Sequence, residues 1–505
     1  MENKLNLAAE RLNEISEKIK SSSTETKRRP TFHFASPAGW CNDPNGFSFY
    51  KNKVHLFFQW HPFSNEWGPM HWGHATTKDF VRWDYLPPAL APDSPADCDG
   101  CFSGTAIESH GKHILCYTGV SEGIQNQCLA SGDGFKYEKF KFNPAVTAKD
   151  IPFEYQRQDF RDPKIFERDG KLFMLCVLKK MDGCGGMVLF ENDSTEDLST
   201  WKFLNVIAES DDGKTEMWEC PDYFKLSEKD ALIFSPQEMK ADFDRGFHDG
   251  NNSVYMCGKL DFSTARFFPE MLGNSMTYSQ IDFGIDFYAP ETTELPDGRR
   301  IMIAWMSSWE SPSTPKDYPW SGMMTFPREL RFHENSLIQN PVKEIQLYRK
   351  EHRRFEISIQ SDGENELQEI HVPDARHFDS ELEFKIDSVD MLIFRIGNES
   401  HFSELNYCTK SMLLTFDRKN TLNSGGRINS RSVKIPPKQN GNISLRMLAD
   451  TNSIEVFAND GLIAFTNVFF LPDDCEGIFI LATSRNKKND EKIIFDYILK
   501  VRSAS

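Results

Sequence analysis

The sequence predicts an all-β protein in two parts: a five-bladed β-propeller over residues 31–340 and a C-terminal antiparallel β-sandwich over 355–505. Three observations support this prediction. A strand-rich pattern recurs with a period near 60 residues in the first part. Short runs that alternate apolar and polar residues fill the second part. The chain, at 505 residues, is also longer than a single hydrophobic core usually supports.

Residues 1–30 predict a helical extension, because apolar side chains recur at helical spacing in a polar segment at Leu5, Leu12, Ile15 and Ile19. This segment has no apolar core of the secretory type, and no other run is long enough to span a bilayer. The eleven cysteines have no regular spacing, which is typical of reduced thiols. We therefore expect a cytoplasmic protein.

The composition limits the possible partners. A net charge of −17 argues against nucleic acid or an anionic membrane as a partner and favours a small substrate, although a local basic pocket for a phosphorylated sugar is compatible with it. Cys98 and Cys101 form a single C-x-x-C without a second pair, so we expect no metal and no cofactor. The oligomeric state is expected to be a monomer or a homodimer.

The first part of the chain contains five segments with one pattern: a small or acidic residue, an apolar run, a turn and a second apolar run. The segments begin at Asn42, Phe102, Arg161, Glu219 and Asp286. Successive intervals are 60, 59, 57 and 67 residues along the corresponding positions Asp43, Ser103, Asp162, Glu219 and Asp286. Each interval has room for the four strands of a propeller blade.

This phasing has a consequence for function. The innermost strand of every blade lines the axis of a propeller, so residues at one point of each repeat converge there. Asp43, Asp162, Glu219 and Asp286 should therefore meet, although 243 residues separate the first from the last. Two carboxylates are the minimum for cleaving a glycosidic bond, since one donates a proton and the other attacks or stabilises the anomeric carbon.

The pattern changes after the fifth segment. Residues 341–354 (PVKEIQLYRKEHRR) predict a short, charged linker helix with little to bury beyond Ile345 and Leu347. Seven or more strand-like runs follow, and Asn459-Asp460-Gly461 is a hairpin signal. This pattern predicts the antiparallel sandwich, which we expect to carry no catalytic residue.

Nine short motifs occur in a fixed order: WCNDPNG (40–46), QWHP (59–62), WGPMHWGHAT (67–76), FSGTA (102–106), RDP (161–163), WECPD (218–222), DFYAPE (286–291), PRELRF (327–332) and LADTNSIEVFANDG (448–461). In this order the chain resembles glycoside hydrolase family 32, which contains invertases, sucrose-6-phosphate hydrolases and fructanases. The resemblance covers roughly residues 30 to 470.

The resemblance implies a retaining β-fructofuranosidase and assigns roles to individual residues. Asp43 matches the nucleophile, Glu219 the acid/base and Asp162 the stabiliser of the transition state. Arg161 could contact the same sugar or orient the carboxylates. The positions that match the fructose pocket are Asn42, Gln59, Trp67, Phe102 and Ser103. Asp286 is expected to steady the funnel or neighbouring side chains.

Several residues also have simpler interpretations. Asp-Pro pairs such as those at Asp43 and Asp162 are common turn initiators when read alone. Cys220 follows Glu219 in a predicted strand, so its side chain should point to the opposite face and serve packing. The segment 305–320 is expected to form part of the rim beside the glucose subsite, or to stack a second fructosyl unit on Trp309 or Trp320.

Two alternative functions stay open at this point. A fructosyltransferase would form the same covalent intermediate and pass it to a sugar instead of water. A non-catalytic carbohydrate-binding propeller would be expected to lose one of the three carboxylates, and all three are present. The sequence does not distinguish sucrose, sucrose 6-phosphate and short fructo-oligosaccharides as substrates.

Overall fold

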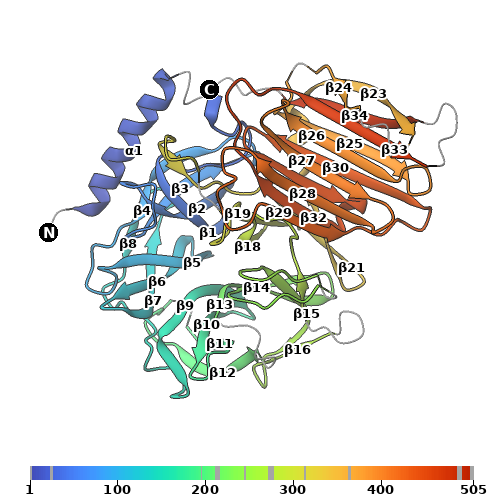
Figure 1. Cartoon of the computed structure of the whole chain (residues 1–505). Helices are drawn as coiled ribbons and strands as arrows, with labels where there is room; N and C mark the ends of the chain where they lie inside the picture. The colour runs from blue at the N-terminus through green and yellow to red at the C-terminus, as the bar shows by residue number, and fades with distance from the viewer. Residues whose placement is uncertain are drawn as a thin grey trace.

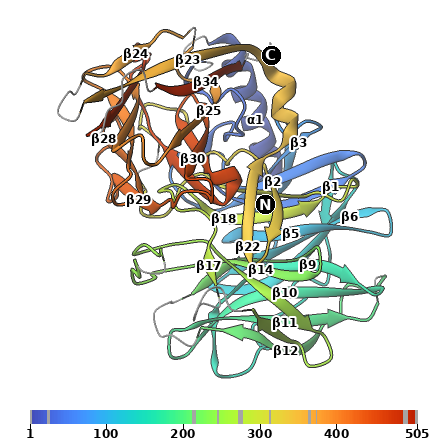
Figure 2. The same ribbon diagram turned by 90° about the vertical axis from the view of Figure 1, so that its right-hand side faces the viewer.

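The structure is a computed structural model that describes residues 3–22, 27–194, 196–210, 217–243, 246–270, 278–311, 314–361, 366–372, 374–485 and 492–500. Two β domains lie side by side, the first coloured from blue to green and the second from orange to red (Figure 1). A 90° turn shows the same arrangement (Figure 2). The predicted fold class, a five-bladed propeller followed by a β-sandwich, is confirmed.

The propeller consists of five antiparallel sheets, and each begins with an innermost strand at the axis. The first sheet contains β1 (Gly39–Tyr50), β2 (Lys53–His61), β3 (His71–Thr77) and β4 (Asp84–Leu90). The second contains β5 (Gly100–Ser109), β6 (Lys112–Ser121), β7 (Ile124–Gly132) and β8 (Tyr137–Lys139). The third contains β9 (Tyr155–Arg168), β10 (Lys171–Lys180), β11 (Gly185–Asn192) and β12 (Lys202–Glu209).

The last two sheets complete the ring. The fourth contains β13 (Trp218–Leu226), β14 (Lys229–Pro236), β15 (Val254–Asp261), β16 (Arg266–Pro269) and β17 (Ser279–Gln280). The fifth contains β18 (Tyr288–Glu294), β19 (Arg300–Trp305), β21 (Arg328–His333) and β22 (Ser336–Pro341). Between β19 and β21 the chain forms β20 (Trp320–Ser321), which pairs in parallel with β1 of the first sheet. This pairing closes the ring by hydrogen bonds between its first and last blades.

All five innermost strands have a register shift at the same point of the repeat. At this point the innermost strand has one residue more than its partner strand. The extra residue lies between Cys41 and Pro44, Phe102 and Gly104, Arg161 and Lys164, Glu219 and Asp222, and Tyr288 and Glu291. Three residues inside these bulges have a positive φ: Asp162 (57°), Cys220 (47°) and Ala289 (52°). A bulge re-aims the side chains of its strand, because two of its residues lie opposite one residue of the partner strand.

The N-terminal extension contains helix α1 (Lys4–Ser21), which packs against β4. Its buried side chains are Ala8, Leu12 and Ile15, whereas Leu5 and Ile19 of the predicted apolar set are only partly buried. Ala8 and Leu12 join a cluster that includes core residues of the first blade, such as Leu56 and Phe58. The helix therefore covers the edge of the first blade.

The predicted linker helix over 341–354 is much shorter than expected. Only Lys343–Tyr348 is helical, as the 3-10 helix η1, and Ile345 is its buried residue. Arg349–Ser361 instead forms the long strand β23, which pairs with β34 (Lys492–Lys500). The charged stretch has no apolar stripe to bury as a helix, whereas the buried Ile357 and Ile359 alternate along a strand that extends back through it.

The second domain contains two sheets that share β23, which pairs antiparallel with β34 in one sheet and parallel with β33 in the other. Their inner faces enclose one hydrophobic cluster that includes Phe378, Phe394, Phe416 and Phe495. The remaining elements are β24 (Gln368–Ile370), β25 (Phe378–Lys385), β26 (Met391–Gly397), β27 (Phe402–Cys408), β28 (Leu413–Asn420), β29 (Ser430–Lys434), β30 (Asn442–Asp450), β31 (Ser453–Ala458), η2 (Asn459–Gly461), β32 (Ile463–Val468) and β33 (Ile478–Ser484).

Buried ion pairs join the two domains. Arg328 of the propeller contacts Glu455 of the sandwich (2.5 Å) and Asp282 of its own domain (2.8 Å). His33, also in the propeller, lies 2.8 Å from Asp450 and 2.7 Å from Glu455. Because all of these side chains are fully buried and mutually paired, the domains are held in one relative position.

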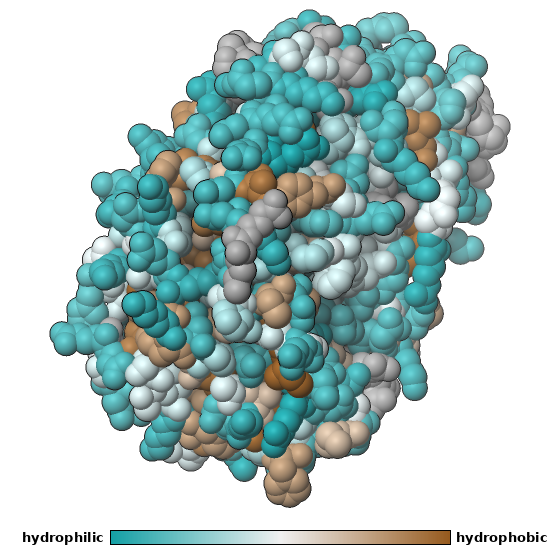
Figure 3. Space-filling model, turned by 90° about the vertical axis from the view of Figure 1, so that its left-hand side faces the viewer, coloured by the Kyte–Doolittle hydropathy of each residue, from teal (hydrophilic) through white to brown (hydrophobic). Residues whose placement is uncertain are grey.

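The outer surface is mostly polar. Figure 3 shows one face of the molecule, where hydrophilic side chains dominate and hydrophobic ones lie scattered among them. Within the described part of the chain, no helix has the length and apolar character needed to cross a membrane.

Candidate active site

The three predicted carboxylates meet at the propeller axis, because the bulges of β1, β9 and β13 direct them there. Asp43 lies within the β1 bulge, Asp162 within the β9 bulge and Glu219 at the start of the β13 bulge. Cys220 joins the first two, since its Sγ lies 3.5 Å from Oδ2 of Asp43 and 3.8 Å from Oδ2 of Asp162. Arg161 joins Asp162 to Glu219.

Asp43 is only 8% exposed, and its two oxygens have different surroundings. Oδ2 accepts a hydrogen bond of 2.6 Å from Oγ of Ser103, in the β5 bulge of the second blade. Oδ1 is buried without a hydrogen-bond partner among the described residues. Burial and the charge of Glu219 raise the pKa of Asp43 to about 6, and the hydrogen bond from Ser103 opposes this rise. The hydrogen bonds that fix this carboxylate are therefore concentrated on Oδ2.

Asp162 is held by backbone groups as well as by charge. Its Oδ2 accepts a hydrogen bond of 2.9 Å from the backbone N–H of Cys220, and its own N–H donates to Oγ1 of Thr118. Nε of Arg161 lies 3.8 Å from the same carboxylate. Burial, together with the charges of Glu219 and Asp43, raises the pKa of Asp162 to about 7, although Arg161 opposes the shift.

Both oxygens of Glu219 have a donor. Oε1 accepts hydrogen bonds from Nη2 (2.9 Å) and Nε (3.2 Å) of Arg161. Oε2 accepts a hydrogen bond of 2.6 Å from the hydroxyl of Tyr288 in the fifth blade. These contacts fix the carboxylate between the third and fifth blades, which is the orientation that a positioned proton donor needs.

Tyr288 is a site residue that the sequence prediction missed. The prediction placed Asp286 at this point of the fifth repeat, two residues too early. Glu219 and Tyr288 each precede a proline, Pro221 or Pro290, by two positions. Asp43 and Asp162 precede their prolines by one position. Aligning the repeats on these prolines would have identified Tyr288. Proline is tolerated in such strands because a bulge leaves one backbone N–H without a ladder partner.

Asp286 faces the second domain, where it steadies neighbouring side chains as expected. Its Oδ2 contacts Nη1 of Arg418 (2.9 Å) and accepts a hydrogen bond from the N–H of Val468 (2.7 Å). Its Oδ1 accepts a hydrogen bond from the hydroxyl of Ser311. The residue therefore joins the propeller to the sandwich and is not one of the carboxylates grouped around Cys220.

The prediction that Cys220 points away from the site is wrong. It assumed a regular strand, in which neighbouring side chains alternate between faces. The positive φ of Cys220 (47°) breaks this alternation and turns the thiol toward Asp43 and Asp162. Burial and the surrounding carboxylates raise the pKa of this thiol well above its usual range, so the sulfur stays protonated.

The residues predicted to shape the fructose pocket differ in how deeply they are buried. Asn42 precedes Asp43, and its Oδ1 accepts a hydrogen bond of 2.8 Å from the indole of Trp40. Gln59 is buried and donates to Oδ1 of Asn45 and to a backbone carbonyl, so it supports the β1 bulge. Trp67 is 51% exposed, with its ring edge-on to Phe102 at 5.8 Å. Trp67 thus presents a free aromatic face, whereas Gln59 does not reach the surface.

The expected rim contains a stack of indoles. Trp309 is 41% exposed and stacks on Trp40 with ring centroids 6.2 Å apart and planes at 19°. Trp305 packs against both rings from the side. Trp320 is fully buried in β20, so the prediction that it could stack a sugar is wrong. The hydrogen bond from Trp40 to Asn42 connects this stack to the residue before Asp43.

The arrangement has a definite chemical capacity. One carboxylate has a free oxygen, a second is held by an arginine and a tyrosine, and a third lies between them. This set can supply a nucleophile, a proton donor and a stabiliser of positive charge without other groups. The fold and site define the class of a β-propeller glycoside hydrolase.

Comparison with known proteins identifies the family. Residues 33–341 match the glycosyl hydrolases family 32 N-terminal domain, and residues 344–495 match the glycosyl hydrolases family 32 C-terminal domain. The chain belongs to glycoside hydrolase family 32, which confirms the resemblance read from the motifs.

Several individual proteins are similar over most of the chain. Sucrose-6-phosphate hydrolase of Escherichia coli is 36% identical over 446 residues, which cover 86% of this chain and 87% of that protein. Raffinose invertase of Escherichia coli is 33% identical with the same coverage. Among solved structures, the Bombyx mori GH32 beta-fructofuranosidase has a TM-score of 0.80 at 28% identity, covering 97% of this chain and 98% of its own.

Proposed function

We propose that this protein is a retaining β-fructofuranosidase, which releases terminal β-D-fructofuranosyl units from sucrose, sucrose 6-phosphate or short fructo-oligosaccharides. The observation that carries the proposal is the pairing of Asp43, which has one unbonded buried oxygen, with Glu219, held by Arg161 and Tyr288. Membership in family 32 and the similarity to sucrose-6-phosphate hydrolases support the same activity.

In the first step the carboxylate of Asp43 attacks C2 of the fructosyl unit, and Glu219 protonates the leaving oxygen. The bond from C2 to the leaving oxygen breaks as an ester to Asp43 forms. In the second step Glu219 takes a proton from water, which attacks C2 and frees Asp43. The pKa of Asp43, about 6, leaves this carboxylate mostly ionised at neutral pH, as the attack requires.

Asp162 and Arg161 act on the same transition state in different ways. Burial and the neighbouring carboxylates raise the pKa of Asp162, which accepts hydrogen bonds from fructose hydroxyl groups when it is ionised and can donate one when it is protonated. Arg161 carries a permanent positive charge between Asp162 and Glu219, so it limits their mutual repulsion. Tyr288 and Arg161 together keep Glu219 directed at the leaving oxygen.

We assign the binding of the leaving group to the indole stack of Trp309 and Trp40. The exposed face of Trp309, backed by Trp40, suits the apolar face of a sugar ring, and Trp67 offers a second such surface. A cytoplasmic location belongs to the same proposal, because all eleven cysteines are free thiols. Imported sucrose, its 6-phosphate or short oligosaccharides are the substrates that fit this location.

The central test is the substitution Asp43→Asn with sucrose as substrate. Loss of the nucleophile should lower kcat by roughly three orders of magnitude or more without loss of the folded state. Asp193→Asn, on the outer side of the third blade, is the matched control and should keep full activity. Fructose released by the wild-type enzyme should appear first as the β-anomer in NMR spectra. Near-normal turnover by Asp43→Asn would refute the assignment.

Assays of the same purified protein distinguish two alternative functions. Accumulation of oligosaccharides at high sucrose concentration would identify a fructosyltransferase, since a sugar would then replace water in the second step. A complete absence of fructose release would favour a carbohydrate-binding propeller. The retention of Asp43, Asp162 and Glu219 at one site argues against that last possibility.

A further inference from the structure

A second cavity opens at the opposite end of the propeller axis. It has a volume of about 630 Å³ and is lined by the same five innermost strands, at residues that follow Asp43, Ser103, Asp162, Glu219 and Tyr288 by at least two to four positions. Phe47 of β1, Phe166 of β9 and Phe224 of β13 are among its walls. Two to four residues of extended strand span about 7–13 Å, and none of the three carboxylates lines this cavity.

The axis is closed between the two ends. The cavity between them, which touches Asp162, Cys220 and Glu291, has a volume of only about 20 Å³. This is room for about one water molecule and far too little for a sugar phosphate. Below it, Nζ of Lys164 pairs with Oδ1 of the buried Asp222 at 2.8 Å. A molecule in the far cavity therefore has to enter from the far side.

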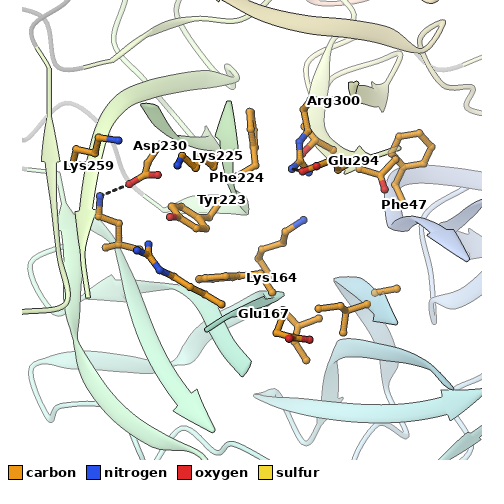
Figure 4. Close-up of a pocket in the computed structure, with 18 residues that line it drawn as sticks. Phe47, Lys164, Glu167, Tyr223, Phe224, Lys225, Asp230, Lys259, Glu294 and Arg300 are labelled. Atoms are coloured by element: carbon orange, nitrogen blue, oxygen red, sulfur yellow. Dashed lines mark hydrogen bonds and ion pairs between the residues drawn. The ribbon is translucent and has the colours of Figure 1, made fainter. Parts of the chain in front are cut away.

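The far cavity is basic in an acidic protein. Its lining has five cationic side chains, Lys164, Arg168, Lys225, Lys259 and Arg300, and three acidic ones, Glu167, Asp230 and Glu294. The whole chain has the opposite balance, with 58 basic and 75 acidic residues. Figure 4 shows Lys164, Lys225 and Arg300 around one hollow together with the rings of Tyr223 and Phe224.

Two of the acidic groups are already engaged. Glu294 accepts a hydrogen bond of 2.7 Å from Nη2 of Arg300, and Asp230 accepts one of 2.8 Å from the N–H of Leu260. By contrast, Nε of Arg300 is buried without a hydrogen-bond partner among the described residues. Lys225 forms no ion pair with any residue in the described part of the chain, and its side chain is exposed. The exposed amino group of Lys225 is therefore open to an incoming anion, and Lys259, which donates to the carbonyl of Glu228, lies on the same wall.

We propose that this cavity is a second ligand site, which binds a small organic phosphate about the size of a sugar phosphate. The volume lies within the range of small-molecule pockets. Lysine and arginine side chains recognise a phosphate dianion through charge-assisted hydrogen bonds, and the aromatic rings contact the organic part. The proposal is independent of the fructosidase activity, because none of the catalytic residues lines this cavity.

The test is isothermal titration calorimetry of the full chain at low salt, with inorganic phosphate and glucose 6-phosphate as probes. The wild type should bind one equivalent of glucose 6-phosphate. The double substitution Lys225→Glu/Lys259→Glu should weaken this binding by at least about tenfold, since it reverses two charges at the cavity. The control Lys410→Glu/Lys434→Glu, on exposed positions of the sandwich, makes the same charge change and should leave binding unchanged.

Saturating fructose distinguishes binding at the two ends of the propeller axis, because fructose occupies the catalytic end. Binding of glucose 6-phosphate that persists in fructose and disappears in Lys225→Glu/Lys259→Glu supports the proposal. No heat with the wild type, displacement by fructose, or equal binding by the double variant overturns it. The milder variant Lys225→Ala/Lys259→Ala should also bind glucose 6-phosphate more weakly, which shows that the loss does not come from misfolding caused by the new glutamates. Sucrose hydrolysis by both double variants should equal that of the wild type.

Discussion

The thiol of Cys220 lies 3.5 Å from the same Asp43 oxygen that accepts the 2.6 Å hydrogen bond of Ser103. Two blades thus donate to Oδ2 and leave Oδ1 free. Hydrogen bonds to the charged form of a carboxylate favour ionisation, and both donors oppose the effect of burial on Asp43. The ionisation of the nucleophile is therefore set by residues that need not touch the substrate.

Ser103→Ala tests this relationship through pH. Loss of the hydrogen bond should raise the pKa of Asp43 further above 6, so the acidic limb of kcat/KM should move upward by roughly one pH unit. Cys220→Ala removes a longer and weaker bond and should produce a smaller shift in the same direction. A pH profile of Ser103→Ala that overlays that of the wild type would contradict the assignment of this limb to Asp43.

Asp43→Asn should stabilise the fold at neutral pH. The pKa of Asp43 rises from 3.8 to about 6 on folding, so the folded state binds more protons than the unfolded state between these values. Stability from this group is greatest below pH 3.8 and is lost as the pH rises through 6. The shift corresponds to about 3 kcal/mol, and a gain of roughly 1–3 kcal/mol is expected at pH 8.

Urea denaturation at two pH values checks this expectation. The free energy of unfolding of Asp43→Asn should exceed that of the wild type at pH 8, and the difference should shrink toward pH 4. Asp193→Asn serves as the control, because that carboxylate is exposed. A difference that grows toward pH 4 would have the wrong sign and would exclude a raised pKa at Asp43.

Tyr288→Phe should reduce kcat/KM for sucrose by about tenfold. The substitution removes the donor to Oε2 of Glu219 and leaves the ring in place, so the fold should be unaffected. Tyr407→Phe removes a comparable buried hydroxyl in the sandwich, bonded to the carbonyl of Ile435, and should retain wild-type kinetics. Equal kinetics for both variants would mean that Tyr288 only packs beside Glu219.

The sequence could predict that Asp43, Asp162 and Glu219 meet, because a 57–60-residue repeat places them on innermost strands that converge on the propeller axis. It could not predict which neighbours share the site. A bulge of one residue changes the facing of Cys220 and puts Tyr288, not Asp286, beside Glu219. Strand periodicity carries no signal for such a bulge, although the recurring prolines do.

The contact between the domains was also beyond the sequence prediction. His33 pairs with Asp450 and Glu455, more than 400 positions away in the chain, and each charge is tolerated in the interior only because the others are present. The linker shows a related limit. Residues after Arg349 become a strand because β34, the last strand of the chain, supplies a partner.

The domain contact should weaken in alkaline solution. Burial opposes a charge on His33, but the carboxylates of Asp450 and Glu455 raise its pKa from 6.5 to about 9. Because the folded value is the higher one, the stabilisation is complete below pH 6.5 and is lost as the pH rises through 9. His33→Gln should cost roughly 3–5 kcal/mol at pH 6, since it leaves two buried carboxylates without this cation.

Thermal unfolding between pH 6 and pH 10 measures this effect. The difference in Tm between the wild type and His33→Gln should be largest at pH 6 and should narrow above pH 9. Other groups that titrate at alkaline pH affect both proteins equally, so their effects cancel in the difference in Tm. His352→Gln is the control, because that histidine is more than half exposed and should give a small, constant difference. A gap that widens with pH would refute the linkage.

Trp309→Ala should change the choice of leaving group more than the chemistry. The indole is exposed, stacks on Trp40 and is linked through Trp40 to Asn42, so its loss removes a surface beside the site and no reacting group. We expect kcat/KM for kestose to fall about tenfold or more and that for sucrose to fall less, since a longer substrate covers more of the platform. Phe268→Ala, an exposed ring on the outer strand β16, is the matched control. Equal losses on sucrose and kestose would show that Trp309 supports Trp40 instead of binding the second sugar.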